Sequence, residues 1–307
     1  MNESVVFFGA GDVAARTLRM LVDNFHIEAV VTKPRPPHHR GPWPVSELAE
    51  EFELRLIEAD NKKSLTAAVL SADFESKVGV LVDFGIIVEQ KVINTFPLGI
   101  VNSHFSLLPQ WRGADPITFS ILSGQSKTGV SLMLLVEKMD EGPLLAVGEA
   151  DIDMVSTTTP ELTSNLIGLS SAMLKDILPK YIAGDIKTAS QTKVAQTVGY
   201  STTPTYSRKL TKEDGILDWT KPAEQLEREV RAYAEWPKSR AILGGHAVIV
   251  TKARAEDGEG TPGDVWREGK RLGVYCTKGI FMIDALKPAG KPEMTTEAFL
   301  SGYGKDL

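Results

Sequence analysis

The chain has 307 residues, of which 42% are hydrophobic, a length and composition natural for two globular domains. Its 34 Lys and Arg against 40 Asp and Glu give a net charge of −6, which excludes a uniformly basic RNA-binding surface. The single cysteine, Cys276, excludes an internal disulfide. No apolar run approaches the length of a membrane span, and the first expected strand leaves no room for a signal peptide, so we expect a cytoplasmic protein without membrane contact.

Short apolar strands alternate with amphipathic helices along the first part of the chain. Alternation of this kind with short connections predicts a Rossmann-like α/β domain, in which a parallel sheet is covered by helices on both faces. Ligands of such sheets bind at the carboxyl ends of the strands. The expected strands are 5–8, 27–31, 54–57, 78–82, 98–101 and 129–136, and the expected helices are 13–22, 45–50, 65–70 and 88–93.

The pattern changes towards the C-terminus. A long helix is expected over 160–182, ending before Gly184, and the polar segment 185–206 is interpreted as a linker. Residues 207–307 then combine one helix, 221–233, with brief strands and Gly-rich turns, a pattern that favours a small β-barrel. The predicted domains are therefore 1–184 and 207–307.

A glycine-rich turn follows the first strand. Residues 9–14, GAGDVA, match G-x-G-x-x-A between a strand and a helix, which is the place of a dinucleotide-binding turn. However, the second strand ends in Val31-Thr32-Lys33-Pro34, with no acidic residue to hold an adenine ribose. This disfavours a nicotinamide enzyme, although Lys33 would tolerate a ribose 2′-phosphate.

Three polar residues follow apolar strands and suit acyl transfer without a covalent intermediate. Asn102 and His104 come directly after 98–101 at positions i and i+2, so their side chains project to the same side. Asp140 lies in the turn after 129–136, where a neighbouring strand can bring it beside His104. Asn102 can donate to the oxyanion of an acyl-transfer step. Asp140 can orient His104 and accept the proton of an attacking amine. Taken singly, each residue also fits a structural role, as a turn cap, a half-buried histidine and a turn residue.

Two segments carry a resemblance to a known family. Residues 101–117, VNSHFSLLPQWRGADPI, resemble the N-x-H-x-S-L-L-P-x-x-x-G segment of the folate-dependent formyltransferases. Residues 128–145, TGVSLMLLVEKMDEGPLL, resemble their second segment, which ends in D-x-G, and the spacing of 36 from His104 to Asp140 also agrees. Within this superfamily the whole chain, from VVFFGAGDVAARTLRML to LKPAGKPEMTTEAFL, is most similar to the methionyl-tRNA formyltransferase family.

The resemblance implies the activity, the co-substrate and the catalytic residues. A member of this family transfers the formyl group of 10-formyltetrahydrofolate to the α-amine of methionine on charged initiator tRNA. Asn102, His104 and Asp140 would be the catalytic residues, and no metal is required. Residues 1–184 would be the catalytic domain, and 207–307 an OB-like tRNA-binding domain. The folate pocket would be formed by two apolar loops, whose residues are Phe84, Gly85, Ile86, Ile87 and Ser106, Leu107, Leu108, Pro109.

The loop 33–44, KPRPPHHRGPWP, is the candidate contact with tRNA. Its basic residues Lys33, Arg35 and Arg40 can neutralise phosphates, and the resemblance places this loop at the acceptor end of the tRNA, although here it is short. The adjacent His38 and His39 lack a matching set of metal ligands and are interpreted as solvated. Asp12, in the glycine-rich turn, would lie near the opening for the amino-acid end of the substrate.

Two other functions remain open from the sequence. A sugar-nucleotide N-formyltransferase would use the same fold, co-substrate and three catalytic residues on an amino sugar. A non-catalytic folate- or RNA-binding relative is the second alternative, and the presence of Asn102, His104 and Asp140 argues against it.

Overall fold

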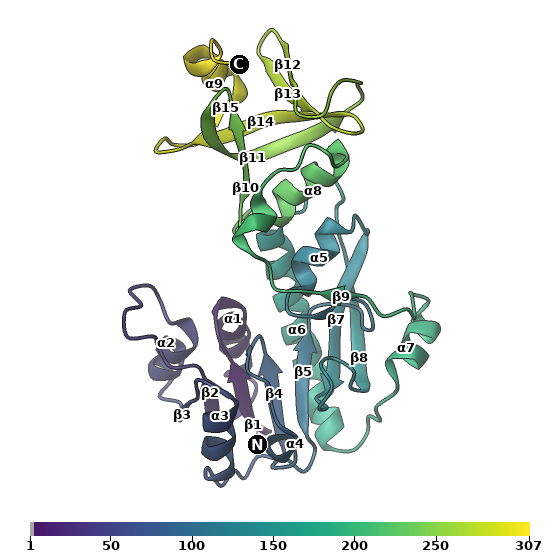
Figure 1. The fold of residues 1–307 in the computed structure, drawn as a ribbon. Helices are drawn as coiled ribbons and strands as arrows, with labels where there is room; N and C mark the ends of the chain where they lie inside the picture. The colour runs from purple at the N-terminus through teal and green to yellow at the C-terminus, as the bar shows by residue number, and fades with distance from the viewer. Residues whose placement is uncertain (1–2) are drawn as a thin grey trace. The chain divides into compact units, whose positions relative to one another are not determined.

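The structure, a computed structural model, describes residues 3–307 and divides into two compact units (Figure 1). The first unit comprises residues 3–116, 127–151 and 163–207. The second comprises 117–126, 152–162 and 208–307. Among residues 3–307, no helix is long and apolar enough to cross a membrane.

The first unit is built on a seven-stranded sheet with the order β3-β2-β1-β4-β5-β7-β8. The five strands from β3 to β5 are parallel, which confirms the expected Rossmann-like fold. The added strands β7 and β8 are antiparallel, so the sheet is mixed. The strands are β1 (Ser4–Gly9), β2 (His26–Thr32), β3 (Leu56–Glu58), β4 (Val78–Val82), β5 (Ile100–His104), β7 (Lys127–Leu134) and β8 (Leu144–Asp151).

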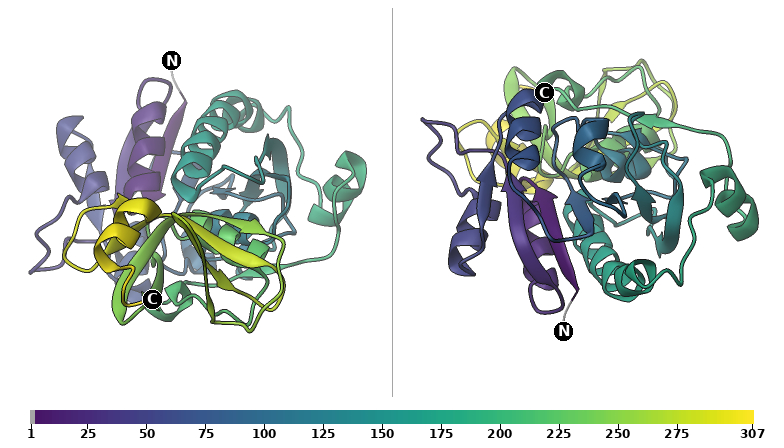
Figure 2. Two further views of the ribbon diagram at one scale, coloured as in Figure 1. Left: turned by 90° about the horizontal axis from the view of Figure 1, so that it is seen from above. Right: turned by 90° about the horizontal axis from the view of Figure 1, so that it is seen from below.

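Helices cover both faces of this sheet, as the alternating pattern predicts. α3 (Lys62–Leu70) and α4 (Gln90–Ile93) pack on the face that carries Val6 and Phe8 of β1. The other face is covered by α1 (Asp12–Leu21), α2 (Pro44–Glu51) and the part of α6 (Thr159–Ile182) that belongs to this unit (Figure 2). A switch point lies between β1 and β4, because the chain leaves β1 for β2 on one side and returns to β4 on the other.

The segment 185–206 is more than a linker. It contains α7 (Gln191–Val198), and Ala189 bridges to Leu144 at the start of β8. At its end, β9 (Tyr206–Ser207) pairs with β6 (Arg112–Gly113), and the whole segment clusters with the first unit. The segment lacks a continuous apolar stripe, and its polar composition therefore predicted a linker. In the structure, polar contacts hold much of it against the first unit.

The second unit contains a six-stranded antiparallel sheet in which β10-β11-β14-β13-β12 are consecutive and β15 pairs with β14. This sheet is the counterpart of the expected OB-like domain, although β11 has 11 residues and is longer than the brief strands expected here. Its core includes Phe281, Phe299 and the free Cys276, whereas Trp236 is exposed. The strands are β10 (Ser239–Leu243), β11 (His246–Glu256), β12 (Val265–Glu268), β13 (Arg271–Tyr275), β14 (Ile280–Pro288) and β15 (Met294–Thr295).

The helices of the second unit complete its fold. α8 (Ala223–Ala232) packs against β11 and β14, and α9 (Thr296–Tyr303) packs against β13 and β14. A 3-10 turn spans Lys212–Gly215, and α5 (Pro116–Leu122) belongs to this unit from residue 117 onwards.

Candidate active site

Asn102 and His104 lie at the carboxyl end of β5, as its last residues rather than beyond it. Ser103 between them turns towards α6, where its hydroxyl lies 2.6 Å from that of Ser170. Because side chains alternate along a strand, Asn102 and His104 point to the opposite face. Asn102 is 7% exposed, and its side-chain amide forms no hydrogen bond to any residue from 3 to 307. A buried amide of this kind is available to a substrate.

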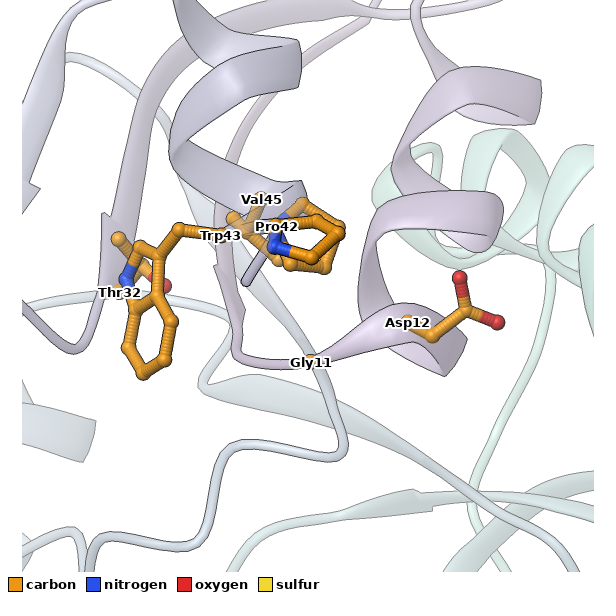
Figure 3. Close-up of a pocket in the computed structure, with 7 residues that line it drawn as sticks. Gly11, Asp12, Thr32, Pro42, Trp43 and Val45 are labelled. Atoms are coloured by element: carbon orange, nitrogen blue, oxygen red, sulfur yellow. The ribbon is translucent and has the colours of Figure 1, made fainter. Parts of the chain in front are cut away.

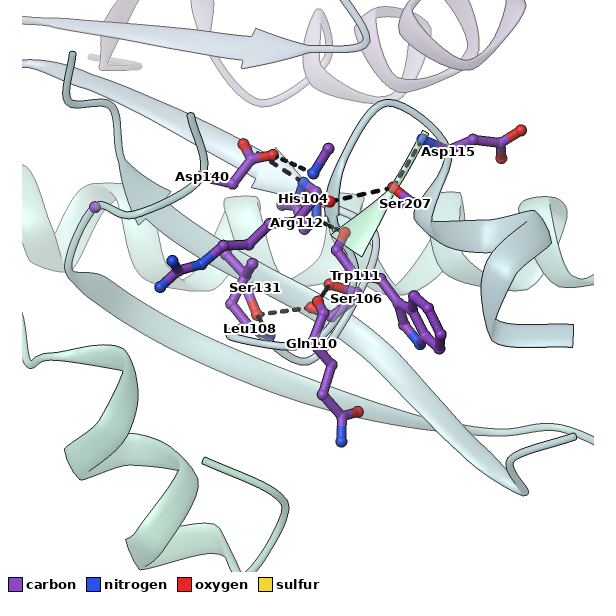
Figure 4. Close-up of polar contacts among 12 residues, drawn as sticks. His104, Ser106, Leu108, Gln110, Trp111, Arg112, Asp115, Ser131, Asp140 and Ser207 are labelled. Atoms are coloured by element: carbon purple, nitrogen blue, oxygen red, sulfur yellow. Dashed lines mark hydrogen bonds and ion pairs between the residues drawn. The ribbon is translucent and has the colours of Figure 1, made fainter. Parts of the chain in front are cut away.

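Asp140 approaches His104 from the loop between β7 and β8. Its Oδ1 lies 3.8 Å from Nδ1 of His104, and its Oδ2 accepts a 2.7 Å hydrogen bond from the backbone N–H of Gly113 (Figure 4). β7 runs antiparallel to β5, with Ser131 opposite His104. The loop after β7 therefore begins at the far end of β5 and must return to reach His104, which is not the strand-end placement that the sequence indicated.

The contacts of His104 define which ring nitrogen carries a proton. Nε2 lies 3.0 Å from the carbonyl oxygen of Trp111, which can only accept, so Nε2–H donates. In the neutral ring, Nδ1 then directs a lone pair towards the Asp140 carboxylate. A second proton, on Nδ1, changes this repulsion into attraction. At 3.8 Å the pair is longer than a hydrogen bond, which leaves Nδ1 able to interact with a reacting group.

The loop that follows β5 is held by hydrogen bonds of its backbone. Ser131 Oγ donates to the carbonyl of Ser106 at 2.7 Å and accepts from the N–H of Leu108 at 3.0 Å. The phenol of Tyr200 donates to the carbonyl of Leu108 at 3.0 Å. Ser106, Leu107, Leu108 and Pro109 are all buried, so their side chains form the frame of this loop, and contact with a ligand would fall mainly to its backbone.

The second loop expected to bind folate follows β4 and divides into buried and open positions. Phe84 is buried in the core, with its ring edge-to-face against Phe8, and Ile86 is partly buried. Gly85 has φ +65°, and Nζ of Lys33 lies 2.9 Å from the position that a Cβ would take there. Ile87 is 65% exposed and is the apolar side chain of this loop that is open to a ligand.

Asp83, immediately before this loop, was not singled out by the sequence. Its φ is +44°, in the left-handed region that non-glycine residues rarely adopt. Although the residue is accessible to solvent, desolvation by the surrounding protein raises the pKa of its carboxyl to about 6, opposed by the charge of Lys33 and reinforced by that of Asp115. The residue borders the switch point, since its backbone carbonyl accepts from the N–H of Ala10 after β1.

The three basic residues of the loop 33–44 differ in their contacts. A guanidinium nitrogen of Arg35 donates to the carbonyl of Gly41 at 2.7 Å and to Glu47 at 3.0 Å. Lys33 is directed towards Gly85, whereas Arg40 is exposed and has no ion pair or side-chain hydrogen bond within the described chain. Lys33 likewise forms no ion pair within the described chain, but it is half-buried and its charge acts on the Asp83 carboxyl, so Arg40 is the exposed unpaired charge of the three.

A cavity of about 370 Å³ lies between this loop and the glycine-rich turn (Figure 3). Asp12 lines it and also pairs with Arg16 at 3.6 Å. The indole N–H of Trp43 donates to the carbonyl of Lys33 at 2.7 Å, which fixes one wall. The lining residues are Gly11, Asp12, Thr32, Pro42, Trp43, Pro44 and Val45.

No group of three or more potential metal ligands occurs among residues 3–307. Nε2 of His39 contacts the carbonyl of Pro42 at 3.1 Å, and its ring lies edge-to-face against Trp43. Asn102, His104 and Asp140 place an amide, an imidazole and a carboxylate at one edge of the mixed sheet.

Comparison with known proteins identifies the family. Residues 4–178 match the family model described as "Formyl transferase", and residues 209–304 match "Formyl transferase, C-terminal domain". The chain is 33% identical, over 98% of its length and 93% of the relative's, to a methionyl-tRNA formyltransferase of Pelobacter propionicus. It is 34% identical, over 97% of its length and 95% of the relative's, to that of Myxococcus xanthus. The chain belongs to the methionyl-tRNA formyltransferase family.

Solved structures share this fold at lower sequence identity. A Helicobacter canadensis N-formyltransferase, in complex with folinic acid and dTDP-3-aminofucose, superposes with a TM-score of 0.68 at 15% identity, covering 92% of this chain and 98% of the other. HypX from Aquifex aeolicus in complex with tetrahydrofolic acid gives 0.63 at 15% identity, covering 99% of this chain and 47% of the other. These likenesses concern the fold.

Proposed function

We propose that this protein transfers the formyl group of 10-formyltetrahydrofolate to the α-amine of methionine esterified to initiator tRNA, with Asn102, His104 and Asp140 as its catalytic residues. The observation that supports the chemistry most strongly is the side-chain amide of Asn102, which is buried and unpartnered among residues 3–307, on the same strand end as His104. Family membership supports the choice of substrate.

The reaction follows from the chemistry of these groups. The neutral amine attacks the formyl carbon and forms a C–N bond, and the formyl oxygen gains negative charge. The Asn102 amide and protonated His104 are the donors for this oxyanion. Asp140 accepts the proton that the amine loses. The oxyanion then re-forms the carbonyl as the bond from the formyl carbon to N10 of the folate breaks. N10 receives the proton that Asp140 accepted, so that tetrahydrofolate and N-formylmethionyl-tRNA are released and the enzyme is restored.

The two loops after β4 and β5 would hold the folate. A pterin ring is flat and has amide-like donors and acceptors, which backbone groups of an irregular loop can match. The backbone of Ser106–Pro109 is fixed by Ser131 and Tyr200 and can serve this purpose without rearrangement. Exposed Ile87 would cover one face of the ligand.

The tRNA would be bound by both units. Arg40 would contact acceptor-stem phosphates, whereas Lys33 lies beside Gly85 and Arg35 is paired with Glu47. Asp12 would border the entrance for the aminoacyl end, and residues 207–307 would bind the remainder of the tRNA. Since charged tRNA is a cytoplasmic molecule, we place the protein in the cytoplasm.

A transfer assay tests this function. The purified protein is incubated with 10-formyltetrahydrofolate that carries an isotopic label in the formyl group, together with charged initiator tRNA. We expect the label on the α-nitrogen of methionine after hydrolysis of the ester. Its absence, with tRNA and folate intact, would refute the proposal. One observation favours the sugar-nucleotide alternative: structural neighbours include a formyltransferase in complex with dTDP-3-aminofucose and a sugar formyltransferase in the presence of dTDP. Amino sugars linked to dTDP are therefore the comparison substrates.

A further inference from the structure

Gln191 is a buried polar residue in the segment expected to be a linker. It is the first residue of α7, after the N-cap Ser190, and is 5% exposed. A polar side chain so deeply buried requires partners for its amide group. Its partners lie in the two loops that carry the candidate catalytic groups.

The amide of Gln191 bridges these two loops. Its Nε2 donates to the backbone carbonyls of Asp140 at 2.7 Å and Gly142 at 3.0 Å. Its Oε1 accepts a 2.7 Å hydrogen bond from the guanidinium of Arg112. Both amide hydrogens and the amide oxygen therefore form hydrogen bonds, and the two hydrogens are donated to carbonyls of the D-x-G turn itself.

Asp140 is held by contacts on two sides, and Arg112 takes part in both. Arg112 stands between Trp111, whose carbonyl accepts from His104, and Gly113, whose N–H donates to the Asp140 carboxylate. Arg112 also pairs with Glu141 at 3.3 Å, within the same turn. The carboxylate of Asp140 is thus fixed from the Gly113 side, and its backbone from the Gln191 side.

The turn needs this support because its local conformation is costly. Asp140 has φ +53°, in the left-handed region that residues with a Cβ rarely adopt. The turn lies outside β7 and β8, so no strand ladder holds Asp140 in place. Without the two hydrogen bonds to its carbonyls, the turn would relax and the separation of 3.8 Å between Asp140 and His104 would change.

We propose that Gln191 is a positioning residue for formyl transfer, which holds the D-x-G turn through two backbone carbonyls so that the Asp140 carboxylate faces His104. The proposal rests on the proposed function, because it assigns Gln191 to the same catalytic set. It also gives α7 a role in the reaction, although the helix lies outside residues 4–178 that match the catalytic family model.

The first test compares two glutamines of one helix. Gln191→Met keeps a similar length and removes all three hydrogen bonds, whereas Gln196→Met makes the same chemical change at an exposed position. We expect kcat of Gln191→Met to fall on the order of 100-fold, the usual result of misplacing a catalytic group by about 1 Å. The dissociation constant for tetrahydrofolate should stay within about twofold, and Gln196→Met should behave as the wild type.

Gln191→Glu separates positioning of Asp140 from support of Arg112. A glutamate still accepts from the Arg112 guanidinium but directs an oxygen without hydrogen at the carbonyls of Asp140 and Gly142. We expect its kcat to fall as far as that of Gln191→Met, even with an unchanged melting temperature. This variant decides the question if Gln191→Met does not fold. A wild-type kcat in Gln191→Glu would overturn the proposal.

A double-mutant cycle gives a readout that a merely structural role would not move. If Gln191 acts through Asp140, adding Gln191→Glu to Asp140→Asn should cost less than threefold in kcat, since residues that act as a unit are not additive. A full further loss would overturn the proposal. Failure of the wild-type protein to formylate charged initiator tRNA would instead refute the proposed function, so the two failures are distinguishable.

Discussion

Replacing Asp140 by Asn tests the catalytic pair with little disturbance of the fold. The substitution keeps the size of the side chain and an oxygen to accept from Gly113 N–H. Asn is also among the residues that best tolerate the left-handed backbone, and Asp140 has φ +53°. The change therefore removes one negative charge beside His104 and little else.

The magnitude follows from the separation of the two groups. At 3.8 Å, and with an effective dielectric constant of about 20, the attraction between the carboxylate and imidazolium is about 4 kcal/mol. Loss of a general acid or base typically costs 10²- to 10⁴-fold, or about 3–5 kcal/mol. The two estimates agree on a fall in kcat of roughly 10³-fold.

The assay is steady-state formylation of charged initiator tRNA, with tetrahydrofolate affinity measured by calorimetry. We expect kcat to fall and the folate dissociation constant to change less than about threefold. Asp151→Asn, an equivalent change at an exposed residue of β8, is the matched control. A kcat for Asp140→Asn within a few-fold of that of the control would refute the role of Asp140.

Three further variants test other parts of the site. Asn102→Ala should cost on the order of 3 kcal/mol of transition-state stabilisation, seen as a roughly 100-fold lower kcat with folate binding retained; a near wild-type rate would contradict the oxyanion role. In Asp83 the pKa is raised from 3.8 to about 6, so the folded state binds more protons between these values and stability falls as pH rises through this window. Asp83→Asn should therefore melt at a higher temperature than the wild type at pH 7.5 but not near pH 4, and equal melting temperatures at both would contradict the desolvated carboxyl. Arg40→Ala should reduce the magnitude of the salt slope of tRNA binding by about one unit. A smaller effect than that of Arg35→Ala would contradict the proposed contact of Arg40 with tRNA phosphates.

Much of the fold could be predicted because strands and helices leave local patterns in the sequence. Apolar runs such as Val78–Val82 are buried in the sheet, and their alternation with helices predicted the layered first unit. The resemblance identified the family, which the comparisons confirm. We also expected Asp140 to lie close to His104, and the structure places them 3.8 Å apart. The expected placement of Asp140 at a strand end was wrong, because β7 runs antiparallel to β5 and the direction of a strand depends on tertiary pairing.

Other features could not be inferred from local patterns. Gln191 lies in a polar stretch, and only the folded chain brings it within 2.7 Å of the Asp140 carbonyl. Asp83 directly precedes Phe84, but its raised pKa comes mainly from desolvation by the folded protein, with opposing contributions from Lys33 and Asp115, which are distant in sequence. The pairing of Arg35 with Glu47 likewise depends on how the loop folds back on α2.

The identity of the formyl acceptor decides between the tRNA function and the sugar-nucleotide function. The most direct measurement compares kcat/KM of the wild-type protein for charged initiator tRNA with that for dTDP-amino sugars, at one concentration of 10-formyltetrahydrofolate. The proposed function predicts a preference for the tRNA of at least about 10³-fold, typical of a site built for one substrate. Efficient formylation of an amino sugar, with charged initiator tRNA left unmodified, would contradict it.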